Sequence, residues 1–173
     1  SGPTGWYGTL DATGAGPNVV ITDNVFYDNI RPLSINDLIL EIDDSNTFHN
    51  PDDVSETNTC NGIFVYTYIV EDDISWGETE VAFIFEDSDW EIGGFGSLSL
   101  ADGVVIKVRS GGILSTLNIP ADTSIVIPFG ASVIFTSYFD DSLKGDTNGD
   151  DDATWASSGD WEGIYNDGED EYV

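Results

Sequence analysis

The 173-residue sequence predicts an all-β fold, and three observations lead to this prediction. Short apolar runs rich in β-branched residues recur along the chain. Glycine, asparagine, aspartate and proline separate these runs, and the 19 glycines fit turns between strands. None of the runs keeps the 3.6-residue period of an amphipathic helix. Sandwich, barrel and solenoid architectures are all compatible with this pattern.

Eight runs are expected to form strands, and a further strand-like run follows the acids at 146–152 and the Gly-Asp-Trp at 159–161. Each run is short, and turn-forming residues lie between the runs. None approaches the roughly 20 apolar residues of a membrane-spanning helix, so no membrane insertion is expected. In chain order the runs are NVVITDNVFY (18–27), DLILEI (37–42), NGIFVYTYIV (61–70), TEVAFIF (79–85), SLSL (97–100), GVVIKV (103–108), TSIVI (123–127) and ASVIFTSYF (131–139).

Internal repetition favours the solenoid. Asn24 matches Asn46 and Phe26 matches Phe48, and in both pairs the second residue follows the first by 22 positions. In a stacked solenoid like residues lie above like, so we expect an asparagine ladder at a turn and an internal phenylalanine stack. Two short matches can also arise by chance in a β-rich chain.

A second repeat has a similar period, with an offset of 19 residues between its matched Leu98 and Leu117. The segments 98–108 and 117–127 align with each other, and a two-residue slip extends the match. The fold prediction is therefore a right-handed parallel β-helix, a solenoid with coils of about 20 residues. The matched pairs are Leu98 with Leu117, Leu100 with Ile119, and Ile106 with Ile127.

The chain is expected to be one domain, residues 1–173, whose two ends resemble each other. GWYGTL (5–10) and DWEGIY (160–165) share a tryptophan and a glycine at matching positions. This similarity between the two ends suggests that the chain is one unit of a tandem array, or a subunit whose first coil continues the last coil of a neighbour. Copies of the same chain are therefore the expected partner. The alternative is a monomer whose termini fold over the ends.

The charge is extreme, with 33 acidic residues against four cations and a net charge of −29. Because phosphate groups are bound by lysine and arginine, the chain is not expected to bind nucleic acid. A hydrophobic content of 40% excludes an acidic disordered tail. The surface suits a saline medium and divalent cations.

One acidic stretch carries a metal-ligand spacing. Asp146, Asn148, Asp150 and Asp152 occupy alternate positions, and such side chains can converge in a tight loop. Oxygen-only ligands favour Ca²⁺ over transition metals. The loop is not an EF-hand, because it lacks the glycine and the bidentate glutamate of that motif. The remaining predicted ligands are Asp140, Asp141 and Asp160.

Two alternatives to this calcium site stay open. The acidic loop can be a solvated face of a saline-adapted protein, with no ion. A second acidic loop, DDSNTFHNPDD (43–53), is a weaker candidate because its spacing is less regular.

The segment from Val133 to Tyr165 resembles one found in bacterial cell-surface parallel β-helix proteins. There, a strand ending in Phe-Thr-Ser is followed by Asp-Asp, a Gly-Asp-Thr-Asn-Gly-Asp loop and Gly-Asp-Trp-Gly-Gly-Ile. The sequence departs at Asp151 and Glu162, where the family usually has glycine, and Ser157–Ser158 replaces a typical Pro-Ala. The resemblance implies an extracellular or cell-surface β-helix without fixing an activity. The matching residues are Phe135, Thr136, Ser137, Asp140, Asp141, 145–150, Gly159, Asp160, Trp161, Gly163 and Ile164.

Catalytic candidates are few, so no enzyme activity is expected. His49 is the only histidine, which leaves little basis for a zinc site or a Ser-His-Asp triad, and we interpret it as a surface or ladder residue. Cys60 is expected to pack as a small hydrophobe. Lys107 and Arg109 lie on an alternating strand and are expected to face solvent.

Four tryptophans in polar surroundings support a second interpretation. Exposed indoles can stack on sugar rings, although an indole beside Gly-Asp more often caps a solenoid core. The expected function is a calcium-stabilised structural or adhesive module that self-associates end to end. The alternative is a β-helix that binds or cleaves carbohydrate, with surface polysaccharide as the partner. The tryptophans are Trp76, Trp90, Trp155 and Trp161.

Overall fold

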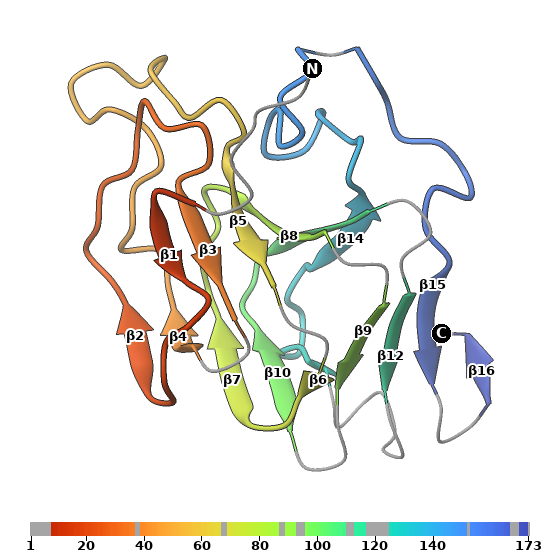
Figure 1. Cartoon of the computed structure of the whole chain (residues 1–173). Helices are drawn as coiled ribbons and strands as arrows, with labels where there is room; N and C mark the ends of the chain where they lie inside the picture. Colours follow the sequence, from red (N-terminus) through yellow and green to blue (C-terminus); the bar gives the residue numbers. More distant parts are fainter. Residues whose placement is uncertain are drawn as a thin grey trace.

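The chain forms an all-β structure with parallel strands, as predicted (Figure 1). The computed structural model describes residues 8–36, 39–66, 69–86, 89–92, 96–109, 113–116, 125–151, 153–166 and 170–172. Every regular element in these ranges is a β-strand. Within them, no helix is long and apolar enough to cross a membrane.

The strands form three sheets. Sheet 1 has the order β1 (Leu10–Ala12), β3 (Leu33–Ile35), β5 (Gly62–Val65), β8 (Ala82–Phe85), β11 (Val105–Val108) and β14 (Ile134–Ser137). Sheet 2 has the order β13 (Ile125–Val126), β10 (Ser97–Leu100), β7 (Asp73–Trp76), β4 (Ile39–Ile42) and β2 (Val19–Ile21). Sheet 3 has the order β16 (Glu171–Tyr172), β15 (Gly163–Asn166), β12 (Ile113–Thr116), β9 (Asp89–Ile92) and β6 (Ile69–Val70).

The chain visits these sheets in turn. From β5 onward, successive strands belong to sheets 1, 3 and 2, and this order repeats until β15. We call the passage from one strand of a sheet to the next strand of that sheet a circuit. Neighbouring strands pair in parallel, and β16 with β15 is the antiparallel exception among the described strands. All eight predicted runs contain at least one strand.

The predicted period of about 20 residues holds for several circuits but fails for others. The pairing of Gly62 with Ala82 has the predicted length, but the circuit that pairs Ile106 with Phe135 is longer. The circuit from β12 to β15 is longer still, because a long connection lies between β14 and β15. The predicted match of Ile106 with Ile127 is therefore incorrect, and Leu98 pairs with Ile125. The other two predicted partners, Leu117 and Ile119, lie outside the described residues.

The first repeat is confirmed in both of its members. The Nδ2 group of Asn24 donates to Oδ1 of Asn46 at 3.0 Å, which forms the predicted amide ladder. The rings of Phe26 and Phe48 stack with centroids 5.1 Å apart. Asn46 also donates to the carbonyl of Ile21 at 2.9 Å, so the ladder ties the turn of one circuit to the strand of the previous one.

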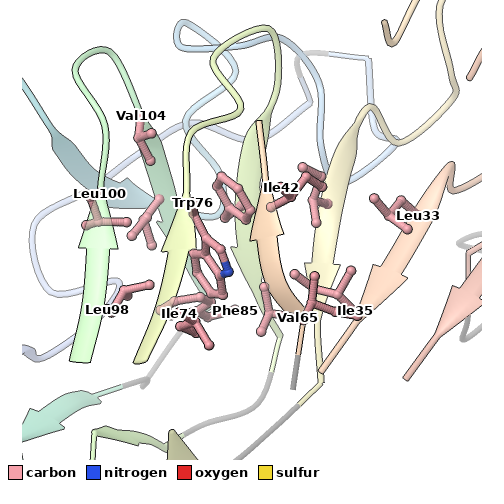
Figure 2. Close-up of a cluster of buried hydrophobic side chains, with 14 of the residues drawn as sticks. Leu33, Ile35, Ile42, Val65, Ile74, Trp76, Phe85, Leu98, Leu100 and Val104 are labelled. Carbon is pink, nitrogen blue, oxygen red and sulfur yellow. The ribbon is translucent and has the colours of Figure 1, made fainter. Parts of the chain in front are cut away.

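One main hydrophobic core takes side chains from all three sheets. Figure 2 shows a part of this core, in which the labelled strand residues belong to sheets 1 and 2. Trp76 stacks on Phe83 at 4.5 Å, and Trp90 stacks on Phe85 at 4.2 Å. The two indoles also contact each other, with centroids 5.6 Å apart. These aromatic contacts link β7 of sheet 2, β8 of sheet 1 and β9 of sheet 3 across the interior.

The expectation of solvent-accessible indoles is therefore wrong for two of the four tryptophans. Trp76 and Trp90 are 0% and 1% exposed, because alternation along each strand turns them inward while polar neighbours such as Ser75 face outward. Two indoles stay accessible. Trp155 is 74% exposed, and Trp161 packs against the core with part of its surface exposed.

The outer face of sheet 1 is also covered. Phe64, Ile84 and Cys60 belong to a second buried cluster on which Tyr138 and Leu143 pack, and the packing of Cys60 confirms its predicted role. These cluster residues alternate in sequence with the core residues of the same strands, so both faces of β5 and β8 are buried.

Candidate metal site

The acidic stretch, by which we mean residues 140–151, lies in the long connection between β14 and β15. It packs against the outer face of sheet 1. Three contacts hold it there. The backbone N–H of Asn61 donates to the carbonyl of Asp146 at 3.1 Å. The ammonium group of Lys144 donates to the carbonyl of Thr79. The ammonium group of Lys107 donates to the carbonyl of Gly145 at 2.8 Å.

Lys107 corrects the sequence-based expectation, because it is 0% exposed and does not face solvent. Its side chain leaves the outer face of β11, between Ile84 of β8 and Thr136 of β14. The segment that covers this face buries the ammonium group, which also donates to Thr147 Oγ1 at 3.1 Å. Burial lowers the pKa of Lys107 to about 8, although nearby carboxylates of the acidic stretch oppose this shift.

Three carboxylates converge in this loop. Asp141, Asp146 and Asp150 each offer an oxygen, and these oxygens lie within 4.8 Å of one another. All three residues are half-buried. At such distances the like charges repel strongly, and a cation held between the three carboxylates would offset this repulsion. Carboxylate oxygens without nitrogen or sulfur ligands suit a hard cation such as Ca²⁺.

Local hydrogen bonds explain why the loop takes this shape. Oδ1 of Asp146 accepts from the backbone N–H groups of Asn148 and Gly149, at 3.1 and 2.6 Å. Its Oδ2 accepts from the N–H of Asp151 at 2.9 Å. Asp151 has φ = 56°, in the left-handed region that favours glycine. Aspartate tolerates this conformation better than most residues, so the turn forms without a glycine at this position.

Asp150 is held by a second set of donors. The hydroxyl of Thr154 donates to its Oδ2 at 2.5 Å, and the N–H of Ala153 donates to its Oδ1 at 3.0 Å. These bonds, led by that from Thr154, lower the pKa of Asp150 and favour the carboxylate form. Asn148 donates to Asp150 Oδ2 at 3.2 Å, so its amide nitrogen faces this carboxylate.

Two of the predicted ligands have other partners. Asp140 accepts from the hydroxyls of Thr136 and Ser142, at 2.7 and 2.5 Å. Desolvation opposes ionisation of Asp140, but the bonds from Ser142 and Thr136 outweigh it and lower its pKa. Asp160 accepts from Ser137 Oγ at 2.6 Å and joins the end of β14 to the segment before β15.

The seven predicted ligands therefore divide into three groups. Asp141, Asp146 and Asp150 form the carboxylate cluster, which Asn148 contacts through its hydrogen bond to Asp150, whereas Asp140 and Asp160 are not part of it. Asp152 lies outside the described residues. In the second acidic loop, Asp43 and Asp53 accept from Ser45 and Ser55, and the described part of that loop brings no three carboxylates together.

A polar cleft of about 620 Å³ lies beside the cluster, and the sequence did not point to it. It separates the 49–61 segment from the 144–151 segment, and His49 and Glu80 line it. Nδ1 of His49 lies 2.6 Å from Oε1 of Glu80. The two residues belong to different connections between strands, so no local motif links them.

No known protein family, curated protein or solved structure matches this chain.

Proposed function

We propose that the three parallel sheets form a right-handed parallel β-helix, which acts as an extracellular structural or adhesive module and associates end to end with copies of itself. The repeated order of sheets 1, 3 and 2 supports the solenoid, as do the asparagine and phenylalanine pairs between circuits. The acidic surface and the resemblance to cell-surface β-helices support the extracellular location.

The observation that carries self-association is the exposure of large apolar side chains at both ends of the strand stack. Internal circuits bury most such side chains, whereas the first and last circuits leave several open to solvent. Exposed apolar surface of this kind marks interaction sites. At the first circuit the side chains are Leu10, Val20, Val25, Tyr27 and Ile30. At the last they are Val126, Ile127, Phe129, Ile134 and Tyr172.

Net charge directs this association along the stack. At −29, two copies repel each other wherever acidic faces approach. Hydrophobic burial and strand pairing at the ends oppose this repulsion, whereas among the described residues the sides of the stack expose fewer large apolar side chains. Salt screens the repulsion, so it promotes growth.

Analytical ultracentrifugation over a range of protein concentrations tests self-association. We expect species larger than the monomer at high concentration, and a larger fraction of them in 1 M NaCl than in 50 mM NaCl. Negative-stain imaging of the same samples separates linear assemblies from irregular aggregates. A monomer at every concentration and both salt levels would contradict the proposed function.

We also propose that Asp141, Asp146 and Asp150 bind Ca²⁺ and so fix the long connection on sheet 1. Affinity on the order of 10⁻⁴ M is usual for extracellular calcium modules. A hundredfold excess of Ca²⁺ over the dissociation constant then adds about 2.7 kcal/mol to the free energy of unfolding.

Thermal melts in EDTA and in excess Ca²⁺ measure this effect. We expect a higher midpoint with Ca²⁺, and Asp150→Ala should remove most of the difference. Asp53→Ala is the matched control, because Asp53 also accepts from a neighbouring hydroxyl, that of Ser55, but lies outside the cluster. Equal midpoints in EDTA and Ca²⁺ for the unaltered protein would rule out a stabilising ion.

The polar cleft favours carbohydrate binding as a second candidate function. Its lining combines amide, hydroxyl and carboxylate groups, which are the donors and acceptors that bind sugar hydroxyls. A glycan array tests binding, and a reducing-sugar assay tests cleavage. A purely structural module gives no signal in either.

A further inference from the structure

A pocket of about 410 Å³ is built entirely from the long connection between β14 and β15. Its walls are the turn at 139–142, directly after β14, and the segment 154–156, and we call it the Trp155 pocket. Its volume lies within the range of small-molecule sites. It shares no lining residue with the polar cleft, so it is a separate candidate site.

The indole of Trp155 lines this pocket and is 74% exposed. A large aromatic side chain left open to water is typical of an interaction site, and the face of an indole can pack on a sugar ring. The ring of Phe139 lines the opposite wall. Among the described residues that line the polar cleft, none is tryptophan, tyrosine or phenylalanine. The Trp155 pocket is therefore the better place for a ring-shaped ligand.

Hydrogen bonds on both sides of Trp155 hold its segment in place. Before it, the hydroxyl of Thr154 donates to Oδ2 of Asp150 at 2.5 Å. After it, the backbone N–H of Ser157 donates to Oδ2 of Asp160 at 2.8 Å, and Asp160 is itself bonded to the end of β14. A platform that is already fixed loses less conformational entropy when a ligand binds.

The opposite wall supplies an oriented carboxylate. Asp140 accepts from the N–H and the hydroxyl of Ser142, at 3.2 and 2.5 Å, and from the hydroxyl of Thr136 at 2.7 Å. Its own N–H donates to the carbonyl of Ser137 at 3.0 Å, which anchors the turn to β14. Because a carboxylate offers about four acceptor sites, Asp140 keeps capacity for a ligand.

The charge of the pocket determines which ligands suit it. Asp140 and Asp141 line it, and none of the residues described as lining it is lysine or arginine. Lys107 interacts electrostatically with both carboxylates, but its ammonium group is fully buried and donates to Gly145 and Thr147. Acidic sugars are therefore repelled, whereas a cationic ligand is attracted, as it is by the net charge of −29. A cation is also attracted to the face of an indole.

We propose that the Trp155 pocket binds amino sugars that carry a free ammonium group, with a sugar ring packed on Trp155 and the ammonium group paired with the carboxylate of Asp140. The ion pair distinguishes the charged sugar from its N-acetylated counterpart and from a sugar with a hydroxyl at that position. The inference rests on carbohydrate binding, the second candidate function, and deepens it by naming the site and the class of sugar.

Isothermal titration calorimetry with three tetrasaccharides of the same linkage tests the class of sugar. They are the β-1,4-linked oligomers of glucosamine, N-acetylglucosamine and glucose. A mildly acidic buffer keeps the sugar amine protonated, and EDTA keeps divalent cations away from the carboxylate cluster. We expect the glucosamine oligomer to bind about tenfold more tightly than either of the others. Equal affinities for all three would overturn the proposed class.

Two substitutions at Trp155 test the stacking platform. Trp155→Ala should weaken binding of the glucosamine oligomer about tenfold, whereas Trp155→Phe keeps a ring and should retain part of the affinity. Phe129→Ala is the matched control, because Phe129 is a fully exposed aromatic residue that does not line the pocket. Equal losses in Trp155→Ala and Phe129→Ala would contradict the platform. Thermal melts check that each variant stays folded.

Asp140→Asn tests the ion pair. We expect it to remove most of the preference for the charged sugar, while the neutral oligomers bind as they do to the unaltered chain. Asp43→Asn is the matched control, since Asp43 accepts from the N–H and hydroxyl of Ser45 as Asp140 does from Ser142. A preference that survives Asp140→Asn would overturn the assigned partner of the ammonium group.

Non-specific attraction to the acidic surface needs its own control. A lysine oligomer of similar charge is titrated against the unaltered chain and Trp155→Ala. Site binding predicts that Trp155→Ala weakens the sugar more than the lysine oligomer. Equal affinities for the two cations, both unchanged by Trp155→Ala, would overturn the pocket.

The outcomes separate this inference from the proposed function. Sugar binding that survives Trp155→Ala but is lost in Glu80→Gln would place the site in the polar cleft, because Glu80 lines that cleft. It would overturn the Trp155 pocket and leave carbohydrate binding standing. Failure of all three oligomers to bind would overturn both. Ultracentrifugation tests self-association separately, so that proposal stands or falls by its own result.

Discussion

Glu78 is a fully buried carboxyl group in the connection between β7 and β8. Its Oε1 accepts from the backbone N–H of Glu80 at 2.7 Å, whereas its Oε2 is buried and has no hydrogen-bond partner among the described residues. Burial raises the pKa of Glu78 to about 7, and the charges of Glu80 and Asp44 add to this effect. The protonated form therefore suits this position.

Glu78 makes stability depend on pH. Its folded pKa lies above the unfolded value of 4.5, so its contribution is complete below pH 4.5 and is lost as the pH rises through about 7. From pH 4.5 to 8, we expect the free energy of unfolding to fall by about 3 kcal/mol more in the unaltered chain than in Glu78→Gln. Urea denaturation at both pH values measures this difference, and parallel pH profiles for the two chains would contradict it.

Lys107 balances part of the charge of the acidic connection. Lys107→Met removes the donor to Gly145 and Thr147 and leaves the carboxylates without their buried counter-charge. We expect a loss of about 3 kcal/mol in EDTA, and a larger stabilisation by Ca²⁺ than in the unaltered chain. Calorimetry in both conditions measures these effects. Arg109→Met, an exposed change two positions away, should stay within about 0.5 kcal/mol.

Connections between circuits act as elements in their own right, and the asparagine ladder is the clearest case. Asn46 is 3% exposed and bonds to the carbonyls of Ile21 and Asp43 and to the side chain of Asn24. Asn46→Ala leaves these buried groups unsatisfied, so we expect a loss of about 2 to 3 kcal/mol in urea denaturation. Asn24→Ala, at the end of the ladder, should cost less than half as much. Equal losses for the two variants would contradict the larger contribution that we assign to Asn46.

Sequence reasoning predicted the elements better than their register. The asparagine and phenylalanine pairs were found because an amide ladder or a ring stack needs like side chains one above the other. The match of segment 98–108 with 117–127 failed because apolar β-branched runs resemble one another at any offset. Circuits differ in the length of their connections: Gly62 pairs with Ala82, whereas Ile113 pairs with the much more distant Gly163. Local sequence does not encode which strand the chain returns to.

At the candidate site, too, sequence reasoning predicted the local loop but not the contacts between distant segments. Alternating acids predicted a loop in which Asp146 and Asp150 converge, and both do. The burial of Lys107 was missed, although the strand alternation was right, because the segment that covers it lies far along the chain, at Gly145 and Thr147. Long-range covering of a sheet face leaves no local pattern.

The whole molecule carries one dominant electrostatic property, a net charge of −29. Folding brings these charges together, so screening should stabilise the folded state more than the unfolded state. We expect the free energy of unfolding to rise by about 1 to 3 kcal/mol between 50 mM and 1 M NaCl, measured with urea because guanidinium is itself a salt. Potassium chloride should give the same curve. A fall in stability with either salt would show that ion pairs, rather than repulsion, dominate.

The order of strands also has a mechanical consequence. Apart from the pairing of β15 with β16, each described strand pairs only with strands one circuit before or after it, so the backbone ladders link neighbouring circuits. A force that pulls along the stack therefore loads the outermost circuit first and peels it away before the next one yields. The circuits that contain β5 and β8 yield later, because the acidic stretch bonds to Asn61 before β5 and to Thr79 before β8 and so holds the two circuits together. A circuit of about 20 residues releases roughly 7 nm of extended chain, and the longer circuits release more. Such a molecule would lengthen in small steps under force and dissipate mechanical energy at each step.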